Sequence, residues 1–339
     1  MVKIKGSKDG DILTADFKGQ SKSLFPDLKK TKALVLLSIR GNPYCTDKYL
    51  KAIIEKALST FAFTTFLIAD EVYWHNLCDD FENANISALK EEAKALGQAF
   101  FEDHLKYFLA APGFNAPEFD SHLIEYFPLD KKEALNKTAN NFEVLNWVDW
   151  LHQSKQYIEL QDNIKALFST EELLSNSVQR VAADFAKRHT NVNESHDLLM
   201  LRSSKYLIEE SPAVMWIAAS LGYQFIVYPG EQIQSFAATK NYFVKNAPQI
   251  NPMFIHHKKP QLLANWLEVS FVRSRSSDKG SKPMPSKEVP GCLSQLMKGV
   301  TEGIFALNLN KQEKIQLVAD IMRHYQEQSV TALLTNETS

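Results

Sequence analysis

The chain has 339 residues, of which 45% are hydrophobic and 23% are charged, and its formal net charge is −2. This composition is typical of a soluble globular protein with one large domain or two small ones. The balanced charge excludes a global basic field, so we expect no DNA binding, and any RNA contact has to use a local patch. No apolar run reaches the ~18 residues of a membrane span, so no membrane association is expected.

The cysteines indicate the redox compartment. Cys45, Cys78 and Cys292 are odd in number and widely spaced. This pattern argues against a disulfide framework and for a reducing environment. The first residues also lack the apolar core of a signal peptide. We therefore expect a cytoplasmic protein.

The first part of the chain predicts an arm followed by one βαβ unit. Residues 1–32 contain eight lysines against four aspartates and are interpreted as a mobile basic arm. Residues 33–37 are continuously apolar, as a buried parallel strand should be. Helical apolar spacing follows over residues 46–57, and a second apolar strand, 63–69, ends at Asp70.

The middle of the chain is predicted to be mainly helical, because apolar residues recur there at helical spacing. Ser211-Pro212 interrupts the pattern, and Pro212 can begin a new helix that stops at Gly222. A strand over residues 223–228 then ends at Tyr228-Pro229-Gly230. The expected helices span residues 87–109, 143–167, 170–189, 195–210 and 212–221.

The last part of the chain has a weaker pattern. Residues 266–272 alternate like a strand, residues 273–290 predict a loop rich in Ser, Lys and Pro, and residues 311–328 predict a closing helix. The alternation of strands and helices indicates an α/β fold with a parallel sheet flanked by helices. The expected organisation is a basic N-terminal arm (1–32), a central α/β domain (33–245) and a C-terminal extension of open role (246–339).

Ser38 stands directly after the first predicted strand, where an open α/β sheet places its active site. By default, a lone serine at a strand end caps the next segment. Gly41 adds a turn in which backbone N–H groups could face a bound carbonyl oxygen. A serine nucleophile needs an activating group. Because the chain has no Gly-x-Ser-x-Gly elbow and no histidine in a triad motif, ordinary hydrolase chemistry is disfavoured.

Two further hydroxyl groups accompany a carboxylate downstream. Tyr206 and Glu210 are four residues apart, so their side chains share one helix face. Taken alone, this pair is more simply a packed tyrosine beside an exposed glutamate. A carboxylate beside a phenol can also hold an ammonium group and relay a proton. Tyr228 ends a strand, where its hydroxyl could simply face water at the rim of the sheet.

Other motifs are missing or weak. The nine histidines show no HExxH or paired-ligand spacing, and the chain has no GxGxxG or Walker A motif, so we expect neither a metal nor a cofactor. Lys90 and Lys94 share one helix face and are normally solubilising residues. They gain a function only if the substrate carries phosphates.

Jointly, the three motifs resemble those of the cyclodipeptide synthases. That family has a serine just after the first strand, a Tyr-x-x-x-Glu soon followed by proline, and a tyrosine ending a later strand. Here these residues are Ser38, Tyr206 with Glu210, and Tyr228. With Gly41 and Tyr228-Pro229, the sequence is similar to the branch that has proline after the last tyrosine. The resemblance covers residues 30–245.

The resemblance implies a Rossmann-like fold related to the catalytic domains of class I tyrosyl- and tryptophanyl-tRNA synthetases, here with a C-terminal extension. It implies that two aminoacyl-tRNAs are the substrates and a diketopiperazine the product, made through an aminoacyl-Ser38 intermediate by ping-pong catalysis. Tyr206 and Glu210 would bind the α-ammonium group, and Tyr228 would pass protons. Leu34, Leu36, Gly41 and Asp70 would contact the substrate, while Lys90 and Lys94 would contact tRNA.

Two other functions are open at this point. One is a non-catalytic relative of the synthetases that binds aminoacyl-tRNA. The other is a serine-dependent acyltransferase that uses Ser38 with a different activated donor, such as a thioester. Oligomers leave little signature in the sequence, and we expect a monomer. The amino acids joined and any tailoring enzyme stay unspecified.

Overall fold

The computed structural model describes the chain over residues 11–18, 25, 27–111, 132, 135–136, 139–189, 194–229, 234–250 and 265–275. All of these belong to one compact unit, Met1–Asn115 with Ser121–Arg275. A second unit, Ala116–Asp120 with Ser276–Ser339, lies outside the described residues. No helix in the described part of the chain is long and apolar enough to cross a membrane.

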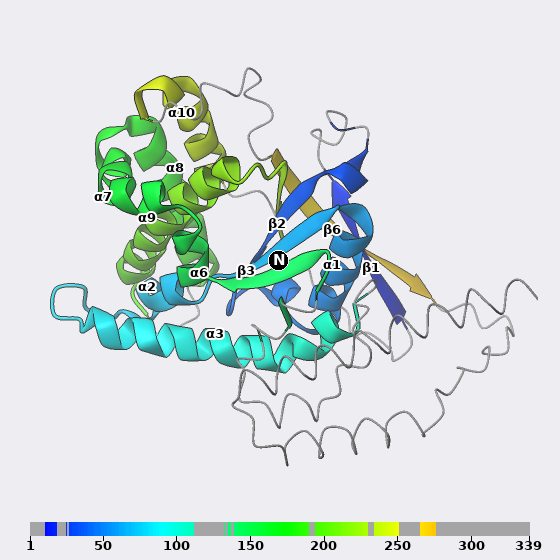
Figure 1. The fold of residues 1–339 in the computed structure, drawn as a ribbon. Helices are drawn as coiled ribbons and strands as arrows, with labels where there is room; N and C mark the ends of the chain where they lie inside the picture. The colour runs from blue at the N-terminus through cyan, green and yellow to red at the C-terminus, as the bar shows by residue number, and fades with distance from the viewer. Residues whose placement is uncertain are drawn as a thin grey trace, which may run out of the picture. The chain divides into compact units, whose positions relative to one another are not determined.

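One mixed sheet of six strands organises the described residues, in the order β1-β6-β5-β2-β3-β4 (Figure 1). β1 is antiparallel to β6, and all other neighbouring strands are parallel. The chain moves outward from β2 to β3 and β4, and then returns to place β5 on the other side of β2. The order therefore reverses between β2 and β5, which is where open α/β sheets bind their ligands. The strands are β1 Asp11–Lys18, β2 Lys32–Leu37, β3 Phe63–Ile68, β4 Phe142–Asn146, β5 Phe225–Tyr228 and β6 Asn265–Arg275.

Helices cover both faces of this sheet. Successive residues of each strand point to opposite sides, so the apolar side chains of one strand pack in two separate cores. Val35 and Phe66 pack in one core with helices α1 and α3, whereas Leu34 and Leu67 pack in another with α6, α7, α9 and α10. The α-helices are α1 Asp47–Thr60, α2 Trp74–Leu77, α3 Ile86–Leu109, α6 Trp147–His152, α7 Lys155–Thr170, α8 Glu172–Arg188, α9 His196–Ser220 and α10 Gln234–Ile250, with short 3₁₀ turns η2 Leu28–Lys30, η3 Pro43–Cys45 and η4 Glu71–Tyr73.

The two central strands confirm the sequence prediction. Every residue of β2 from Ala33 to Leu37 is buried, and so are the last five of β3. Because both faces of these strands are covered by helices, they have continuous apolar runs rather than alternation. The predicted α/β class, a mainly parallel sheet flanked by helices, is thereby confirmed.

The two segments that join the sheet at its outer edge differ from the expectation. Residues 11–18, which we expected within a mobile arm, form β1, where buried Ala15 and Phe17 alternate with Asp16. Asp16 forms an ion pair with Lys56 of α1 at 3.2 Å. The strand expected at 266–272 is present and longer, as β6, so residues 273–275 are not loop. The remaining domain limits stay predictions, and the loop from 276 and the helix at 311–328 lie outside the described residues.

The prediction of a helix from residue 143 was also wrong for its first residues. Residues 142–146 form β4, which pairs with β3 from Thr64↔Phe142 to Ile68↔Asn146. Glu143 interrupts an apolar run, which makes the segment read as one turn of an amphipathic helix. In the sheet it instead accepts a hydrogen bond from the hydroxyl of Thr65 at 2.7 Å.

Helix α9 is continuous, which corrects the predicted break at Pro212. Proline lacks an N–H and costs an intrahelical hydrogen bond, so an interruption was expected there. Every residue from Glu210 to Ala219 is buried, however, and this burial holds the helix together through Pro212. The helix therefore carries Tyr206 and Glu210 directly on the segment that packs against the sheet.

Candidate active site

Ser38 lies in a tight turn after β2. Its backbone N–H donates to the Sγ of Cys45 at 3.4 Å, and its hydroxyl donates to the carbonyl of Arg40 at 2.7 Å. Gly41 has a φ of +79°, in the left-handed region that favours glycine, and so allows the chain to turn back into η3. The side chain of Ser38 is half-buried, so its hydroxyl is accessible from solvent.

Tyr206 and Glu210 form a hydrogen-bonded pair on α9. The Tyr206 hydroxyl donates to Oε1 of Glu210 at 2.9 Å, across one helical turn. Glu210 is only 3% exposed, and burial raises the pKa of its carboxyl to about 8, although the hydrogen bond from Tyr206 opposes that rise. Burial and the neighbouring Glu210 raise the pKa of Tyr206 well above its ordinary value. The pair therefore holds one dissociable proton near neutral pH.

Glu209, the neighbour of Glu210 in the sequence, points to different partners. Its Oε2 lies 2.8 Å from Nε2 of His75 and 4.0 Å from Nζ of Lys165. Burial alone would raise the pKa of Glu209, but the hydrogen bond with His75 and the charge of Lys165 leave it lower than usual. Glu209 is thus an ion-paired carboxylate, whereas Glu210 is hydrogen-bonded to Tyr206, as expected from their separation around the helix.

Tyr228 at the end of β5 lies within electrostatic reach of the other motifs. Burial raises its pKa first, and the charges of Glu210 and Cys45 raise it further. Tyr228 and Tyr206 also pack against the same hydrophobic core. Cys45, which accepts the N–H of Ser38, is thus one of the groups whose charge acts on Tyr228. Ser38 and Tyr228 follow and end two neighbouring strands, β2 and β5, and Glu210 acts on Tyr228 through its charge; a shared catalytic role of the three motifs stays a prediction.

Tyr73 and Cys45 belong to this group and were missed. Tyr73 raises the pKa of Tyr206, although its effect is smaller than those of burial, Glu210 and Tyr228. Tyr73 lies in η4, five residues after β3 ends, and Cys45 lies in η3 after β2. Their positions just after two strand ends were a usable signal, because those ends meet at one edge of the sheet.

The predicted side-chain contacts Leu34 and Leu36 belong to the core. They are 0% and 3% exposed and share a cluster with Trp147, Trp150 and Trp216. Tyr206 and Tyr228 pack against that same cluster, so both leucines lie within the core beneath the site. Their contact with a substrate stays a prediction.

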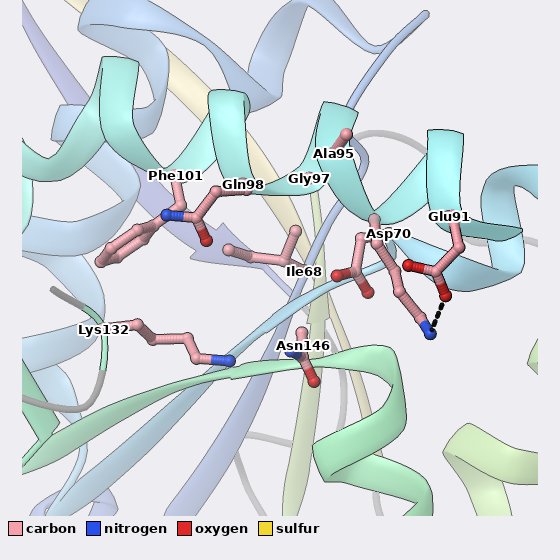
Figure 2. A pocket seen from close by; sticks show the side chains of 10 residues that line it. Ile68, Asp70, Glu91, Ala95, Gly97, Gln98, Phe101, Lys132 and Asn146 are labelled. Atoms are coloured by element: carbon pink, nitrogen blue, oxygen red, sulfur yellow. Dashed lines mark hydrogen bonds and ion pairs between the residues drawn. The ribbon is translucent and has the colours of Figure 1, made fainter. Parts of the chain in front are cut away.

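Asp70 lines a cavity of about 340 Å³ between α3 and the ends of β3 and β4. Figure 2 shows its carboxylate beneath α3, with Lys132 and Asn146 on the opposite wall. Its Oδ1 accepts the backbone N–H of Trp147 at 2.8 Å, and burial raises its pKa. Asp70 has a structural role at the start of α6, and its contact with a substrate stays a prediction.

The two lysines expected to contact tRNA share one acidic partner. Lys90 and Lys94 each lie 2.9 Å from a different carboxylate oxygen of Glu71, and Lys94 also pairs with Glu91. The side chains of Lys90 and Lys94 are 34% and 39% exposed, so both ammonium groups still reach solvent. The hydrogen bonds that Lys94 donates to Glu71 and Glu91 raise its pKa. The pairing fixes both lysines on one face of α3.

The site contains three tyrosines, one neutralisable carboxyl group, a serine and a cysteine. Among the described residues, no three His, Cys, Asp or Glu side chains converge as a metal site. Such a site can bind an ammonium group, move a proton and present a hydroxyl to an activated carbonyl.

Comparison with solved structures places this site in a known fold. Neither a family model nor a curated protein matches the chain. A CDPS structure from Fluoribacter dumoffii is similar with a TM-score of 0.55 and 20% identity, covering 78% of this chain and 100% of that one. The chain has the fold of a cyclodipeptide synthase.

Two further structures align less well. A CDPS from Staphylococcus haemolyticus has a TM-score of 0.47 and 14% identity, over 76% of this chain and 99% of that one. The tyrosyl-tRNA synthetase of Archaeoglobus fulgidus has a TM-score of 0.36 and 13% identity, over 77% of this chain and 59% of that one.

Proposed function

We propose that this protein is a cyclodipeptide synthase that joins two aminoacyl groups, each delivered as an aminoacyl-tRNA, into a diketopiperazine. The observation that carries the proposal is the hydrogen bond between Tyr206 and Glu210, together with the electrostatic effect of Glu210 on Tyr228, which ends the strand beside the one that precedes Ser38. The sheet order reverses between these two strands, and the fold is shared with a CDPS structure. The reaction belongs in the cytoplasm, where aminoacyl-tRNAs are made.

In the first step, the hydroxyl oxygen of Ser38 attacks the ester carbonyl of one aminoacyl-tRNA. A bond forms between Oγ and the carbonyl carbon, and the ester bond to the tRNA ribose breaks. The Ser38 proton passes, by way of the tyrosines, to the departing ribose hydroxyl. The ester is already activated, so the exchange of one ester for another is nearly balanced in free energy.

In the second step, the amino group of the serine-bound residue attacks the ester of the other aminoacyl-tRNA. A peptide bond forms, the second tRNA leaves, and a dipeptidyl-enzyme results. Attack in the opposite sense would free Ser38 and leave the dipeptide on tRNA. The new terminal amino group then attacks the Ser38 ester, which closes the ring and regenerates the hydroxyl. Proximity favours this intramolecular step.

Glu210 suits the handling of the amino group. Its pKa of about 8 is close to the pKa of an ordinary α-ammonium group, which is also about 8. Proton transfer between the two is therefore nearly thermoneutral, the condition under which general acid–base catalysis works best. Tyr206 supplies a second hydrogen-bonding group beside the same nitrogen.

Phosphate contacts to tRNA are assigned to Lys90 and Lys94. Both lie on one face of α3 with partly exposed ammonium groups. Such contacts make binding dependent on salt concentration, because each phosphate that is neutralised releases counterions.

The test is mass spectrometry of the culture medium from a bacterial host that expresses the chain. Wild type should yield masses of two amino-acid residues joined without water, and Ser38→Ala should yield none. Ser59→Ala is the matched control, because Ser59 donates to Lys56 O from an exposed position on α1. It should leave the product unchanged.

Three results would point elsewhere. Product formed by Ser38→Ala at the wild-type rate would overturn the nucleophile assignment. Binding of aminoacyl-tRNA without any covalent adduct on Ser38 would favour a non-catalytic binding protein. An adduct that still forms after nuclease has destroyed the tRNA would favour an acyltransferase with another donor.

A further inference from the structure

The backbone pairing between β2 and β5 is short. It consists of Ala33↔Phe225, Leu34↔Ile226 and Val35↔Val227. The register ends there, before Ser38 on one strand and before Tyr228 on the other. Ser38 and Tyr228, two of the residues proposed for catalysis, therefore lie beyond the last position at which β2 pairs with β5. Tyr228 still pairs with Glu268 of β6, but the β2–β5 register does not join it to the strand that precedes Ser38.

Pro229 prevents the pairing from continuing. Proline has no N–H to donate, so the ladder cannot extend past Tyr228 through this residue. The right-handed twist of neighbouring strands also tends to separate chains beyond their last paired residues. Another contact is needed to keep the two loops in one arrangement.

Asn42 provides that contact. Its Nδ2 donates to the carbonyl oxygen of Pro229 at 2.6 Å, across 187 residues of sequence. Its Oδ1 accepts the backbone N–H of Tyr44 at 3.0 Å and so caps η3. Since one end of the amide must donate and the other must accept, neither a carboxylate nor a flipped amide satisfies both partners. The half-buried Asn42 is thus matched to this position.

A similar contact joins the same two strands at their other end. Gln224 precedes β5, and its Oε1 accepts the N–H of Lys32 at 2.7 Å, while its Nε2 donates to Gly222 O at 2.6 Å. Side-chain amides therefore fasten both ends of the short β2–β5 pairing. Only Asn42 lies at the end that carries Ser38 and Tyr228.

We propose that Asn42 is a positioning residue that sets the distance between Ser38 and Tyr228 by fastening the turn after β2 to the carbonyl of Pro229. The proposal rests on the proposed function, because it assigns Asn42 to the reaction of Ser38. Asn42 itself touches no reacting atom. It acts through the backbone of the two loops.

The test compares two isosteric substitutions at opposite ends of the same pair of strands. Asn42→Asp keeps the acceptor for Tyr44 N and replaces the donor to Pro229 with an oxygen. Gln224→Glu makes the same change toward Gly222, away from the site. Asn42→Ala is a second variant that removes the bridge without adding charge. Far-UV circular dichroism and thermal unfolding establish that each variant is folded at the assay temperature.

The readout is the single-turnover rate at which Ser38 acquires an aminoacyl group, followed by intact-protein mass spectrometry. Asn42→Asp and Asn42→Ala should lower this rate by about 100-fold, since misplacement by about 1 Å has that effect. The Michaelis constant for aminoacyl-tRNA should stay within about twofold, because ground-state contacts remain. Gln224→Glu should keep both values near wild type even where its melting temperature falls.

Three outcomes would overturn the proposal. The first is an Asn42→Asp acylation rate near that of wild type. The second is a loss that Gln224→Glu shares in proportion to its loss of melting temperature, because that would reflect stability alone. The third is a wild-type protein that forms no aminoacyl-Ser38, in which case the proposed function fails as well. The first two leave the proposed function intact.

Discussion

Glu209 and Glu210 are consecutive residues of α9 whose carboxyl groups have pKa values displaced in opposite directions. The pKa of Glu209 is lower than usual because His75 and Lys165 outweigh the effect of its burial. Burial raises the pKa of Glu210 to about 8. Neighbouring acids held in different protonation states commonly have different tasks. Here one carboxylate joins α9 to α2 and α7, and the other is bonded to Tyr206 on the same helix.

The raised pKa of Glu210 should destabilise the fold as pH rises. Below its ordinary value of 4.5, both the folded and unfolded chains hold the proton, and the penalty is absent. Between pH 4.5 and about pH 8, only the unfolded chain releases the Glu210 proton, so the stability of the fold falls with increasing pH. The free energy of unfolding of Glu210→Gln minus that of wild type should therefore grow by about 1.4 kcal/mol per pH unit.

Urea unfolding at pH 5, 6, 7 and 8 measures this difference. Glu209→Gln is the matched control, because the pKa of Glu209 is lowered and its contribution is lost only in acid. Its difference from wild type should be flat between pH 7 and 8. A flat difference for Glu210→Gln as well would contradict the raised pKa.

Tyr206→Phe should shift the pH dependence of product formation. The Tyr206 hydroxyl stabilises the ionised form of Glu210, so its removal raises the pKa of that carboxyl further above 8. The acidic limb of the rate profile should move to higher pH, together with a fall in rate. Cyclodipeptide formation measured from pH 6 to 9.5, corrected for spontaneous ester hydrolysis, checks this.

Tyr157→Phe is the control for that experiment. Tyr157 is a fully buried tyrosine of α7 whose hydroxyl has no hydrogen-bond partner among the residues that the structure describes. Its removal should leave the acidic limb in place. An unchanged acidic limb in Tyr206→Phe would mean that a group other than Glu210 controls the pH–rate profile.

Gly97→Ala should destabilise the protein although alanine is the better helix former. A Cβ at position 97 would overlap the side chain of Asp70, which lies against α3. Overpacking of a core costs about 1–3 kcal/mol, against a helix-propensity gain of about 1 kcal/mol. Chemical denaturation should show a net loss, and the exposed Ala99→Gly should show the propensity effect alone. A stabilised Gly97→Ala would mean that α3 can move away from Asp70.

Substitutions at Glu71 and its two lysines should have opposite effects on tRNA binding. Lys90→Gln with Lys94→Gln should weaken binding and lower the salt slope by about 2, about 1 for each phosphate contact. Glu71→Gln should strengthen binding, because it releases both ammonium groups from their carboxylate partner. Anisotropy of labelled tRNA across salt concentrations measures both.

Lys51→Gln is the control for the lysine substitutions, since Lys51 pairs with Glu55 on α1 at 2.9 Å. Its effect on tRNA binding should be small. If the double lysine variant also bound like wild type, tRNA would contact another face.

The central strands and the Tyr206–Glu210 pair were predictable because each depends on local sequence. β2 and β3 are buried on both faces, which produces unbroken apolar runs, and a four-residue spacing is enough to place two side chains on one helix face. The break expected at Pro212 was wrong, since burial of the surrounding helix overrides a local preference.

The edge strand and the cross-strand contacts could not be predicted in the same way. β1 alternates buried Ala15 and Phe17 with charged residues, a weak pattern that lysine-rich surroundings conceal. The bond from Asn42 to Pro229 joins residues 187 positions apart and exists only once β5 has aligned with β2. Asn42 precedes a proline, and its local sequence indicates only a turn.

The pairing of β1 with β6 has a consequence for synthesis on the ribosome. The first strand of the sheet is made at once, but its partner spans residues 265–275 and emerges only after most of the chain. Until then, Phe17 lacks its β6 neighbours, and the edge of β1 is open to other chains. A nascent chain stalled before residue 265 should therefore recruit chaperones and aggregate more readily than one released beyond residue 275.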